Sequence, residues 1–534
     1  MEIMEQISNL PIGIQSFEDI RTRDFKYVDK TRYVYNLVSF AKSYFLSRPR
    51  RFGKSLFLST LKAYFEGKKE LFRGLELEEL EIKLAKIQNR EEWVKHPVLY
   101  LDFNVGNFTT LEDFKSSLAV KLSDWEDLYG ISEHEAENMT HTDRFALVIK
   151  TAYEKSERQV VVLVDEYDKP LLNVVENEKL LDSFRALLKS FYGVIKGYDQ
   201  YICFAFLTGV TRFDKVSIFS DLNNLIDISM SNEFAAVCGY TQEELESNFA
   251  LEIEILAKNE GISREECLLE LKEQYDGYIF SSKPSNIYNP FSVMSAFKNC
   301  EFGSYWFATG TPTFLVKMMQ KTSFPLETIE DGIDVDGTSL EGYRLNSELP
   351  VPMLYQTGYL TIKAYEKDIQ AFTLGFPNNE VRYGFLKCLI PYYAGFENGT
   401  DKIEIVNFIK EIRSGQTEEF MKRIQSIFAA APKKTSQKYY ELDAQAFFWL
   451  IFKLIGQFIQ CEVQNGEGRS DAVVWTKDSI YVFEFKLDGS AEEAIEQIKS
   501  KNYAIPYQSD GRKLVLIGAN FSSETKNLTG WVVE

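Results

Sequence analysis

Gly53-Lys54-Ser55 is the feature that most constrains this chain, because it closes the stretch Phe45 to Leu56, FLSRPRRFGKSL, between an apolar segment and a helical pattern. In a phosphate-binding loop with the pattern Gly, four residues, Gly-Lys-Ser/Thr, backbone N–H groups surround the phosphates, the lysine contacts the outer phosphates and the hydroxyl holds Mg²⁺. Arg48 takes the place of the first glycine here, and it lacks glycine's freedom to turn tightly around an anion. The flanking segments favour the loop, since Ser43 to Ser47 predicts a strand and Leu56 to Phe65 an amphipathic helix.

Composition narrows the class of protein. A chain of 534 residues, 45% of them hydrophobic, is long enough for about two to four domains. The six cysteines form no CxxC pair, which favours a reducing cytoplasm over a disulfide framework or a zinc cluster. No run approaches the roughly 18 apolar residues of a membrane helix, and the N-terminus has no apolar signal segment, so we expect neither membrane insertion nor secretion. The net charge of −19 means that any nucleic-acid contact must be local.

Strands and helices alternate after the loop. An apolar strand ends at Asp102, two amphipathic helices follow, and Gln159 to Asp165, QVVVLVD, is a continuous apolar run typical of a strand buried on both faces. This alternation predicts an α/β fold with a parallel sheet. The run ends in an acidic pair, where Asp165 would coordinate Mg²⁺, directly or through water, and Glu166 would polarise the water that attacks ATP. The alternative is that this acidic stretch only caps the next helix.

A second buried strand, Tyr201 to Leu207, leads into Thr208-Gly209-Val210-Thr211-Arg212. At the tip of a strand beside the acidic one, the hydroxyl and the guanidinium group would sense the terminal phosphate, since the planar fork of an arginine matches phosphate oxygens. The alternative is that Arg212 pairs with a nearby surface carboxylate.

Three segments carry a resemblance to a known family: SRPRRFGKSL at Ser47 to Leu56, VLVDEYDKPL at Val162 to Leu171, and TGVTRF with SIFSDLNNL at Thr208 to Leu225. Over about the first 230 residues the chain resembles the predicted AAA-type ATPases of bacteria, in which RPRRFGKS is the family's own form of the loop. The resemblance implies bound ATP and Mg²⁺, Thr211-Arg212 as the sensor pair, and a lid proline against the adenine, for which Pro290 is the candidate. The nucleotide-binding residues that it implies in the loop are Pro49, Arg50, Arg51, Phe52, Gly53, Lys54, Ser55 and Leu56, with Ser55 and Asp165 as metal ligands.

The middle of the chain is mostly helical. Thr241 to Lys258 begins with a capping box, Thr241 and Glu244. Met353 to Tyr365 and Ala371 to Phe376 resemble a helix end with a two-stranded wing, so a winged-helix module is expected, serving as a structural arm rather than a DNA reader. The expected domains are an ATPase core (1–230), a helical lid (231–300), a winged-helix-like arm (301–385), a helical connector (386–434) and a nuclease-like domain (435–534).

A second chemical site lies near the C-terminus. Ser479 to Leu487, SIYVFEFKL, alternates as a strand with Glu484 and Lys486 on the same face. A hairpin would bring Asp471 next to Glu484, where the two carboxylates can hold Mg²⁺. Lys486 would activate or orient water and stabilise the charge that develops on a phosphate, which is the chemistry of phosphodiester hydrolysis.

This part of the chain, roughly residues 435 to 534, is similar to the PD-(D/E)XK nuclease superfamily. The segments that carry the resemblance are Gly468-Arg469-Ser470-Asp471, Glu484-Phe485-Lys486 and Gln497-Ile498-x-x-Lys501-x-Tyr503. It implies catalytic roles for Asp471, Glu484, Lys486 and Gln497, the last on a flanking helix. Glu441 would match the early helical acid, although Glu462 competes for that role, and Ser470 stands where the motif has proline.

We therefore expect a cytoplasmic α/β ATPase with a lid and a winged-helix-like arm, fused to a small mixed α/β nuclease domain that cleaves DNA or RNA with Mg²⁺ or Mn²⁺. ATP binding and hydrolysis would gate the second site, and analogy with similar fusions suggests defence against phage or handling of mobile DNA. Two alternatives remain: a signalling ATPase whose C-terminal fold is an inert docking module, and a DNA-binding regulator that works through the winged-helix-like segment. Assembly as a homo-oligomer is also open, because many such ATPases take an arginine from a neighbour.

Overall fold

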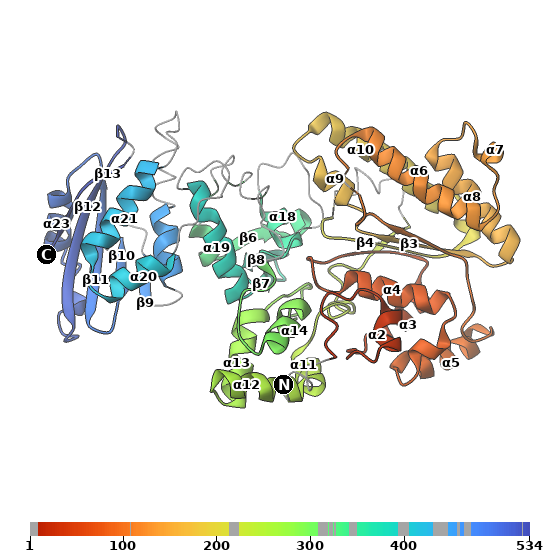
Figure 1. Ribbon diagram of the computed structural model, residues 1–534, viewed down its shortest axis with the longest axis horizontal. Coiled ribbons are helices and arrows are strands. Elements are labelled where there is room, and N and C mark those ends of the chain that lie inside the picture. Colours follow the sequence, from red (N-terminus) through yellow and green to blue (C-terminus); the bar gives the residue numbers. More distant parts are fainter. Residues whose placement is uncertain are drawn as a thin grey trace. The chain divides into compact units, whose positions relative to one another are not determined.

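Five parallel strands form the larger sheet of the N-terminal part, in the order β2-β3-β4-β1-β5 (Figure 1). Their bounds are β1 Ser43–Ser47, β2 Val98–Asp102, β3 Val160–Asp165, β4 Ile202–Gly209 and β5 Ile226–Asp227. Strand β4 lies between β1, which leads into the predicted phosphate loop, and β3, which ends in the acidic pair. The predicted α/β class with a parallel sheet is confirmed.

The computed structural model describes residues 9–106, 108–212, 224–307, 315, 319, 324, 327–340, 350–393, 405–430, 447–456, 460–463, 471–525 and 527–534. The chain forms two units, the first made of Met1–Thr309 with Asp331–Glu380, and the second of Gly310–Glu330 with Val381–Glu534. Each unit is described separately below.

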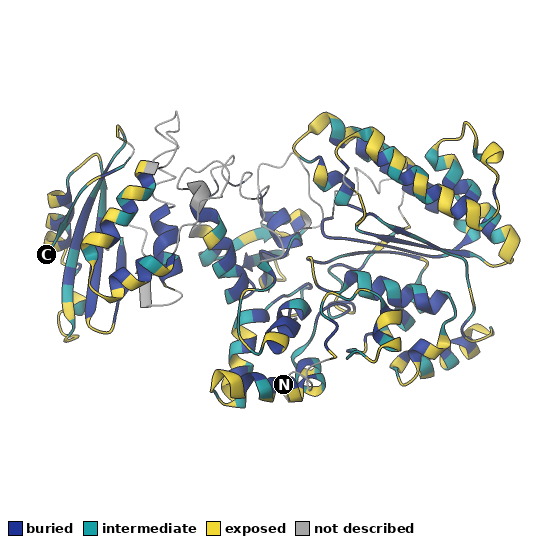
Figure 2. Cartoon of the chain, in the orientation of Figure 1, coloured by how far each residue is buried: buried dark blue, intermediate teal, exposed yellow. Residues whose placement is uncertain are grey.

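Helices cover both faces of the parallel sheet (Figure 1). One face carries α2 Phe17–Thr22, α3 Arg32–Phe40, α4 Lys54–Phe65 and α5 Glu76–Gln88, and the other α6 Leu111–Leu128, α8 His141–Ser156, α9 Lys169–Asn173 and α10 Glu178–Gly197. Between them β3 is buried along its whole length, as its continuous apolar sequence requires (Figure 2). Short elements complete this region: η1 Lys69–Phe72, α7 Glu133–Ala136 and η2 Asp199–Tyr201.

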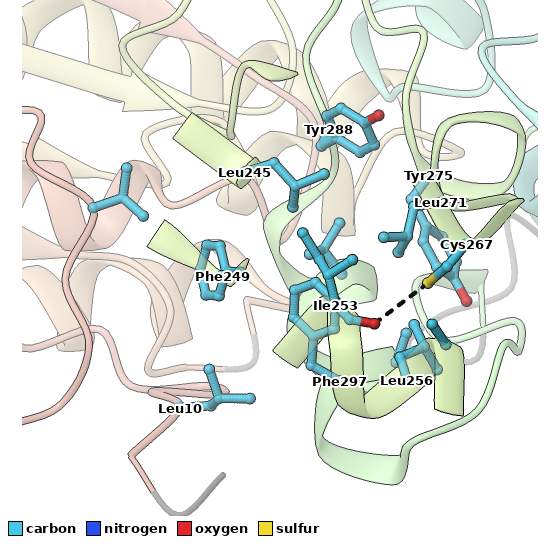
Figure 3. Close-up of a cluster of buried hydrophobic side chains, with 14 residues drawn as sticks. Leu10, Leu245, Phe249, Ile253, Leu256, Cys267, Leu271, Tyr275, Tyr288 and Phe297 are labelled. Carbon is cyan, nitrogen blue, oxygen red and sulfur yellow. Dashed lines mark hydrogen bonds between the residues drawn. The ribbon is translucent and has the colours of Figure 1, made fainter. Parts of the chain in front are cut away.

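A cluster of four helices follows the sheet and has its own core. They are α11 Gln242–Asn248, α12 Ala250–Glu260, α13 Arg264–Tyr275 and α14 Pro290–Asn299. Figure 3 shows the buried side chains that they share, among them Leu245, Ile253 and Leu271, together with Leu10 from the N-terminal segment. The Cys267 thiol donates to the Ile253 carbonyl across this core (3.7 Å). The predicted capping box of Thr241 and Glu244 is present, but the single helix expected from Thr241 to Lys258 is two helices that meet at Phe249.

A small antiparallel sheet, in the order β6-β8-β7, completes the first unit. Its strands are β6 Ile333–Asp336, β7 Thr361–Glu366 and β8 Ala371–Gly375, with the helices α17 Gly337–Leu340 and α18 Val351–Gln356. The predicted order of a helix end followed by a two-stranded hairpin is therefore present in α18, β7 and β8. Helix α19 Asn379–Tyr393 then begins in the first unit and continues into the second.

The second unit contains a mixed sheet in the order β13-β12-β11-β10-β9, with helices on both sides (Figure 1). Its strands are β9 Gln460–Val463, β10 Ala472–Trp475, β11 Ser479–Leu487, β12 Lys513–Ser522 and β13 Asn527–Val533, and its helices include α16 Glu327–Asp331, α20 Ile405–Arg413, α21 Thr417–Ala430, α23 Ala491–Ser500 and the turn η4 Ile505–Tyr507. Strands β11 and β12 pair in parallel, whereas the other pairs are antiparallel. Helix α23 provides the crossover between the parallel strands. The predicted mixed α/β domain is confirmed.

Helices α20 and α21, within the segment that the sequence suggested as a connector, belong to this unit. Gln425 of α21 donates to the Leu528 carbonyl of β13 (2.9 Å), and Trp531 donates to Glu418 (3.1 Å). These helices therefore pack on the mixed sheet.

Candidate active sites

A cavity of about 440 Å³ lies in the first unit at the start of α4. The loop residues Arg50, Arg51, Phe52, Gly53, Lys54, Ser55 and Leu56 line it. The N-terminal segment around Gly13 and the start of α14, with Pro290 and Phe291, form other parts of its wall. The predicted loop and the predicted lid proline therefore face the same space.

The loop backbone turns at two residues with positive φ, Arg51 (65°) and Gly53 (98°), and α4 begins immediately after the second. Gly53 is the position where the left-handed backbone requires a glycine. Because the first N–H groups of a helix lack carbonyl partners, the start of α4 suits an anion. The buried Lys54 ammonium group donates to the carbonyls of Arg48 and Pro49 (3.0 Å each), so it lies across the loop.

Arg48 occupies the position of the first consensus glycine, and it is not among the described residues with positive φ. Its side chain is fully buried and donates to the carbonyls of Ser229 (2.7 Å) and Phe234 (3.0 Å). The guanidinium carbon lies 4.2 Å from the ring centroid of Phe280. Arg48 therefore anchors the loop to the following segment, while neighbouring Pro49 contacts Gly358 and lines a separate small cavity.

The acidic pair lies at the carboxyl end of β3. Asp165 is buried, and it accepts hydrogen bonds from the Ser55 hydroxyl and from the Glu166 N–H (3.0 Å). Burial raises the pKa of Asp165 to about 6, whereas the Ser55 hydrogen bond and the charge of Lys54 lower it. Glu166 lines the cavity and has a positive φ of 49°. The two predicted metal ligands, the Asp165 carboxylate and the Ser55 hydroxyl, are therefore next to each other. Glu166 faces the cavity.

The predicted sensor residues have protein partners. The Thr211 hydroxyl and N–H donate to the buried Asp168 carboxylate (2.5 and 2.6 Å). Arg212 forms an ion pair with Asp227 (2.5 Å), and both side chains are mostly buried. Neither Thr211 nor Arg212 is among the described residues that line the cavity. Arg212 therefore pairs with a carboxylate, as the alternative prediction from the sequence has it. That alternative expected a surface carboxylate, whereas Asp227 is mostly buried.

The second site lies on the β10–β11 hairpin. The N–H of Asp471 donates to the Phe483 carbonyl (3.1 Å), and its carboxylate accepts from the Phe485 N–H (2.8 Å). This pairing places Asp471 beside Glu484, whose carboxylate lies 3.5 Å from the Lys486 ammonium group. The three residues predicted from the sequence are therefore together.

Gln497 of α23 joins this group. Its amide donates to Glu484 Oε1 and its carbonyl accepts from Lys486 Nζ, and Tyr503 OH lies 3.3 Å from the amide nitrogen. The other oxygen, Glu484 Oε2, is buried and has no hydrogen-bond partner among the described residues. Burial and the charge of Asp471 raise the pKa of Glu484 to about 7. A buried carboxylate oxygen without a donor beside a second carboxylate fits a divalent cation, which takes oxygen ligands.

Comparisons with known proteins identify a family for each of two regions of the chain. Residues 11–219 match the family described as "Predicted AAA-ATPase", and residues 439–531 match the "PD-(D/E)XK nuclease superfamily". A protein of Azotobacter chroococcum mcd 1, named "Uncharacterized protein in vnfD 5'region", is 34% identical over 540 residues, which cover 98% of each chain. The chain belongs to the predicted AAA-ATPase-like family. It also carries a C-terminal PD-(D/E)XK superfamily domain. No solved structure matches.

Two predicted features of the PD-(D/E)XK domain cannot be placed. Glu441 and Ser470 lie outside the described residues, and so does the side chain of the competing Glu462. Within the part of the chain that the structure describes, no three His, Cys, Asp or Glu side chains converge as a metal site. The same part contains no helix long and apolar enough to cross a bilayer.

Sequence reasoning missed several residues that shape the AAA-ATPase-like site. Asp168 holds Thr211, and Lys30 lines the cavity while it donates to Glu244 (2.6 Å) and the Ala236 carbonyl (2.8 Å). The run DEYDK contains Asp168, but only the first two acids were given a role. Nothing in the local pattern around Lys30 indicates a partner more than 200 positions away.

Proposed function

We propose that the first unit binds and hydrolyses ATP with Mg²⁺. The observation that carries this proposal is the hydrogen bond between Ser55 and Asp165 at the edge of the cavity, beside Lys54 and Glu166. Ser55 and Asp165 would hold Mg²⁺, which when bound neutralises charge on the β- and γ-phosphates. Lys54 would exchange its two loop carbonyls for phosphate oxygens, and Glu166 would orient the attacking water and accept its proton.

The helical cluster would act as the lid over the nucleotide. Pro290 and Phe291 begin α14 at the cavity wall, where they offer an apolar surface to the adenine ring. Arg212 forms an ion pair with Asp227, so it would have to leave this carboxylate to contact the terminal phosphate. We therefore propose that Thr211 and Arg212 sense the phosphate in a state in which the lid has closed over the nucleotide. The small sheet with α18 would form the winged-helix-like arm, and the five domains expected from the sequence remain part of this proposal.

The second unit is proposed to cleave DNA or RNA phosphodiester bonds with Mg²⁺ or Mn²⁺. The supporting observation is the Glu484 oxygen that has no donor among the described residues and lies beside Asp471. Asp471 and Glu484 would hold the cation, which supplies an activated water. Lys486 would donate to a phosphate oxygen, and Gln497 fixes Lys486 and Glu484 relative to each other.

Gating of cleavage by ATP is the further part of this proposal, and it rests on the two sites sharing one chain. A cytoplasmic location, homo-oligomeric assembly and a role in phage defence or mobile-DNA handling remain predictions. The signalling alternative, with the C-terminal domain as a docking module, is the second candidate, and the cleavage experiment below distinguishes it from the nuclease.

The experiment is cleavage of labelled single- and double-stranded DNA and RNA by the full chain, in Mg²⁺ or Mn²⁺, with and without ATP. Wild type is compared with Lys54→Ala and Lys486→Ala, and with Lys499→Ala, a lysine on the same helix as Gln497 that pairs with Glu534 (2.7 Å). Loss in both Lys54→Ala and Lys486→Ala supports gated cleavage, and loss in Lys486→Ala alone supports an ungated nuclease. Absence of cleavage by wild type in every condition favours the docking alternative.

A further inference from the structure

Glu380 is a buried carboxylate in the first turn of α19, with 2% of its surface exposed. It accepts hydrogen bonds from the Ser292 hydroxyl (2.7 Å) and the Trp306 N–H (2.6 Å), and also from the N–H groups of Tyr305 and Phe307. None of these described partners is a cation. Such an arrangement of donors around one carboxylate stabilises its ionised form against the cost of burial.

Two partners of Glu380, Ser292 and Trp306, connect it to the proposed nucleotide cavity. Ser292 lies in α14 two residues after Pro290, which lines the cavity. Trp306 reaches the phosphate loop, because its indole N–H donates to the Arg50 carbonyl (3.0 Å). One carboxylate therefore fixes both the helix at the cavity wall and the side chain that holds the loop backbone.

A contact between the two branches closes this network. The guanidinium group of Arg51 lies over the ring of Phe291, 5.1 Å from its centroid. Arg51 also has the strained positive φ of the loop, so its backbone depends on neighbours that hold it in place. The carbonyl held by Trp306 belongs to the preceding residue, Arg50.

We propose that Glu380 is a positioning residue of the nucleotide site: through Ser292 and Trp306 it holds α14 and the phosphate loop in the arrangement that binds ATP. The inference rests on the proposed function of the first unit. Because α19 continues from Glu380 into the second unit, Glu380 also lies where the chain leaves the nucleotide site for the nuclease-like unit.

Glu380 differs from an ordinary structural contact in its response to pH. Burial raises the pKa of Glu380 to about 7, although its hydrogen bonds lower it. The titratable groups that face it are Tyr275, Tyr278 and Tyr305, and burial raises the pKa of each tyrosine, so all three stay neutral near pH 7. Protonated Glu380 carries an O–H donor that faces the donors of Ser292 and Trp306. We therefore expect protonation to weaken the hydrogen bonds that Glu380 accepts from these two residues.

The test is the affinity of the full chain for a fluorescent ATP analogue with Mg²⁺, measured from pH 6 to pH 8.5. Glu380→Gln mimics the protonated acid, so the ratio of wild-type to Glu380→Gln affinity isolates the titration of Glu380 from that of other groups. We expect a ratio of about ten at pH 8.5 and near one at pH 6. Trp306→Phe, which loses only the indole donor, should weaken binding at every pH without removing the pH step.

The control is Glu126→Gln, which alters another buried glutamate, paired with Arg144 (2.6 Å) in α8 and outside the cavity wall. Its affinity ratio should stay near one throughout. Equal affinities of wild type and Glu380→Gln at all pH values would overturn the inference, as would a ratio that does not change with pH. If wild type binds no nucleotide, the proposed function itself fails, which is a separate outcome. If Glu380→Gln does not fold, Ser292→Ala removes one hydrogen bond but keeps the carboxylate, so it should weaken binding at every pH and retain the pH step. An affinity of Ser292→Ala equal to that of wild type at every pH would then overturn the inference.

Discussion

The guanidinium group of Arg48 lies over the ring of Phe280, with 4.2 Å between the guanidinium carbon and the ring centroid. This contact explains how the loop accommodates arginine at the position of its first consensus glycine. The loop needs no left-handed backbone there, and the side chain turns away to bind carbonyls of the segment that follows β5. A departure from the consensus is thus a structural anchor.

Arg48→Gly, which restores the consensus glycine, should destabilise the first unit by about 3 kcal/mol. The substitution removes a cation–π contact and leaves the Ser229 and Phe234 carbonyls without their buried donor. Chemical denaturation followed by circular dichroism measures the change. Arg158→Gly, at an exposed position, is the control and should change stability by less than about 0.5 kcal/mol. A glycine variant as stable as wild type would refute the anchoring role.

The Asp168 carboxylate accepts from the Val210 N–H, the Thr211 N–H and the Thr211 hydroxyl. Asp168→Asn replaces one carboxylate oxygen with an NH₂ group, which cannot accept these hydrogen bonds, so it should destabilise the first unit by about 2–3 kcal/mol. Thr211→Val removes only one donor and should cost about 1 kcal/mol. The free energies of unfolding of the two variants give the comparison. Asp182→Asn, on the exposed face of α10, serves as the matched control. Equal losses for Asp168→Asn and Asp182→Asn would contradict the prediction.

Lys54→Ala and Glu166→Gln should separate ATP binding from hydrolysis. Loss of the lysine removes a phosphate contact, so we expect ATP affinity to fall at least about tenfold. Glu166→Gln keeps the shape of the cavity wall but removes the proposed base, so hydrolysis should slow by about 10²–10³-fold with ATP affinity nearly unchanged. Equilibrium titration and phosphate release give the two quantities. Rapid hydrolysis by Glu166→Gln would assign the base to another residue.

Glu484→Gln should stabilise the metal-free protein above pH 7. The pKa of Glu484 is about 7 in the folded chain and about 4.3 in the unfolded chain. As pH rises between these values the unfolded state releases its proton first, so the stability of the wild-type protein falls and then levels off above pH 7. The glutamine variant avoids this loss, and its advantage at pH 8 should be about 1–3 kcal/mol.

Thermal unfolding with a chelator measures this difference. Added Mn²⁺ or Mg²⁺ should reverse the order, because a cation that binds the folded wild-type site stabilises it, whereas the glutamine variant has lost a ligand. The control is Asp478→Asn, in the exposed turn before β11. Its unfolding temperature should equal that of wild type with and without metal. Wild type that is more stable than Glu484→Gln in chelator at pH 8 would contradict the prediction.

Much of this fold could be predicted from local sequence. Strands β3, β4 and β11 are continuous apolar or alternating runs. A buried strand needs such a pattern whichever strands and helices surround it, so the pattern can be recognised without the tertiary structure. The hairpin geometry of Asp471 and Glu484 could also be predicted, because it depends on residues 13 positions apart in one antiparallel pair.

Other features depend on partners far away in the sequence. Asp29 and Thr31 are residue types that often cap a helix, and a helix follows them. Their side chains instead accept from the N–H groups of Glu76 and Leu77 at the start of α5. Segment 66–95 is charged and has the pattern of a solvated surface helix, yet Glu81 within it is fully buried against Tyr64 and Arg90. The local sequence of a capping residue is the same whether it caps the next helix or a distant one, and the sequence of a charged helix is the same whether it is exposed or partly buried. Which of these occurs depends on the tertiary structure.

The division of the chain into units sets an order during synthesis. Every residue of the first unit, through Glu380, leaves the ribosome before Asp471, Glu484 and the crossover helix α23. Strand β11 is also incomplete until β12, residues 513–522, is made and pairs with it in parallel. Because domains generally fold as they emerge, the unit that carries the phosphate loop is assembled before the nuclease-like site can exist. A nascent chain therefore lacks the paired carboxylates Asp471 and Glu484 until the phosphate-loop unit has been made.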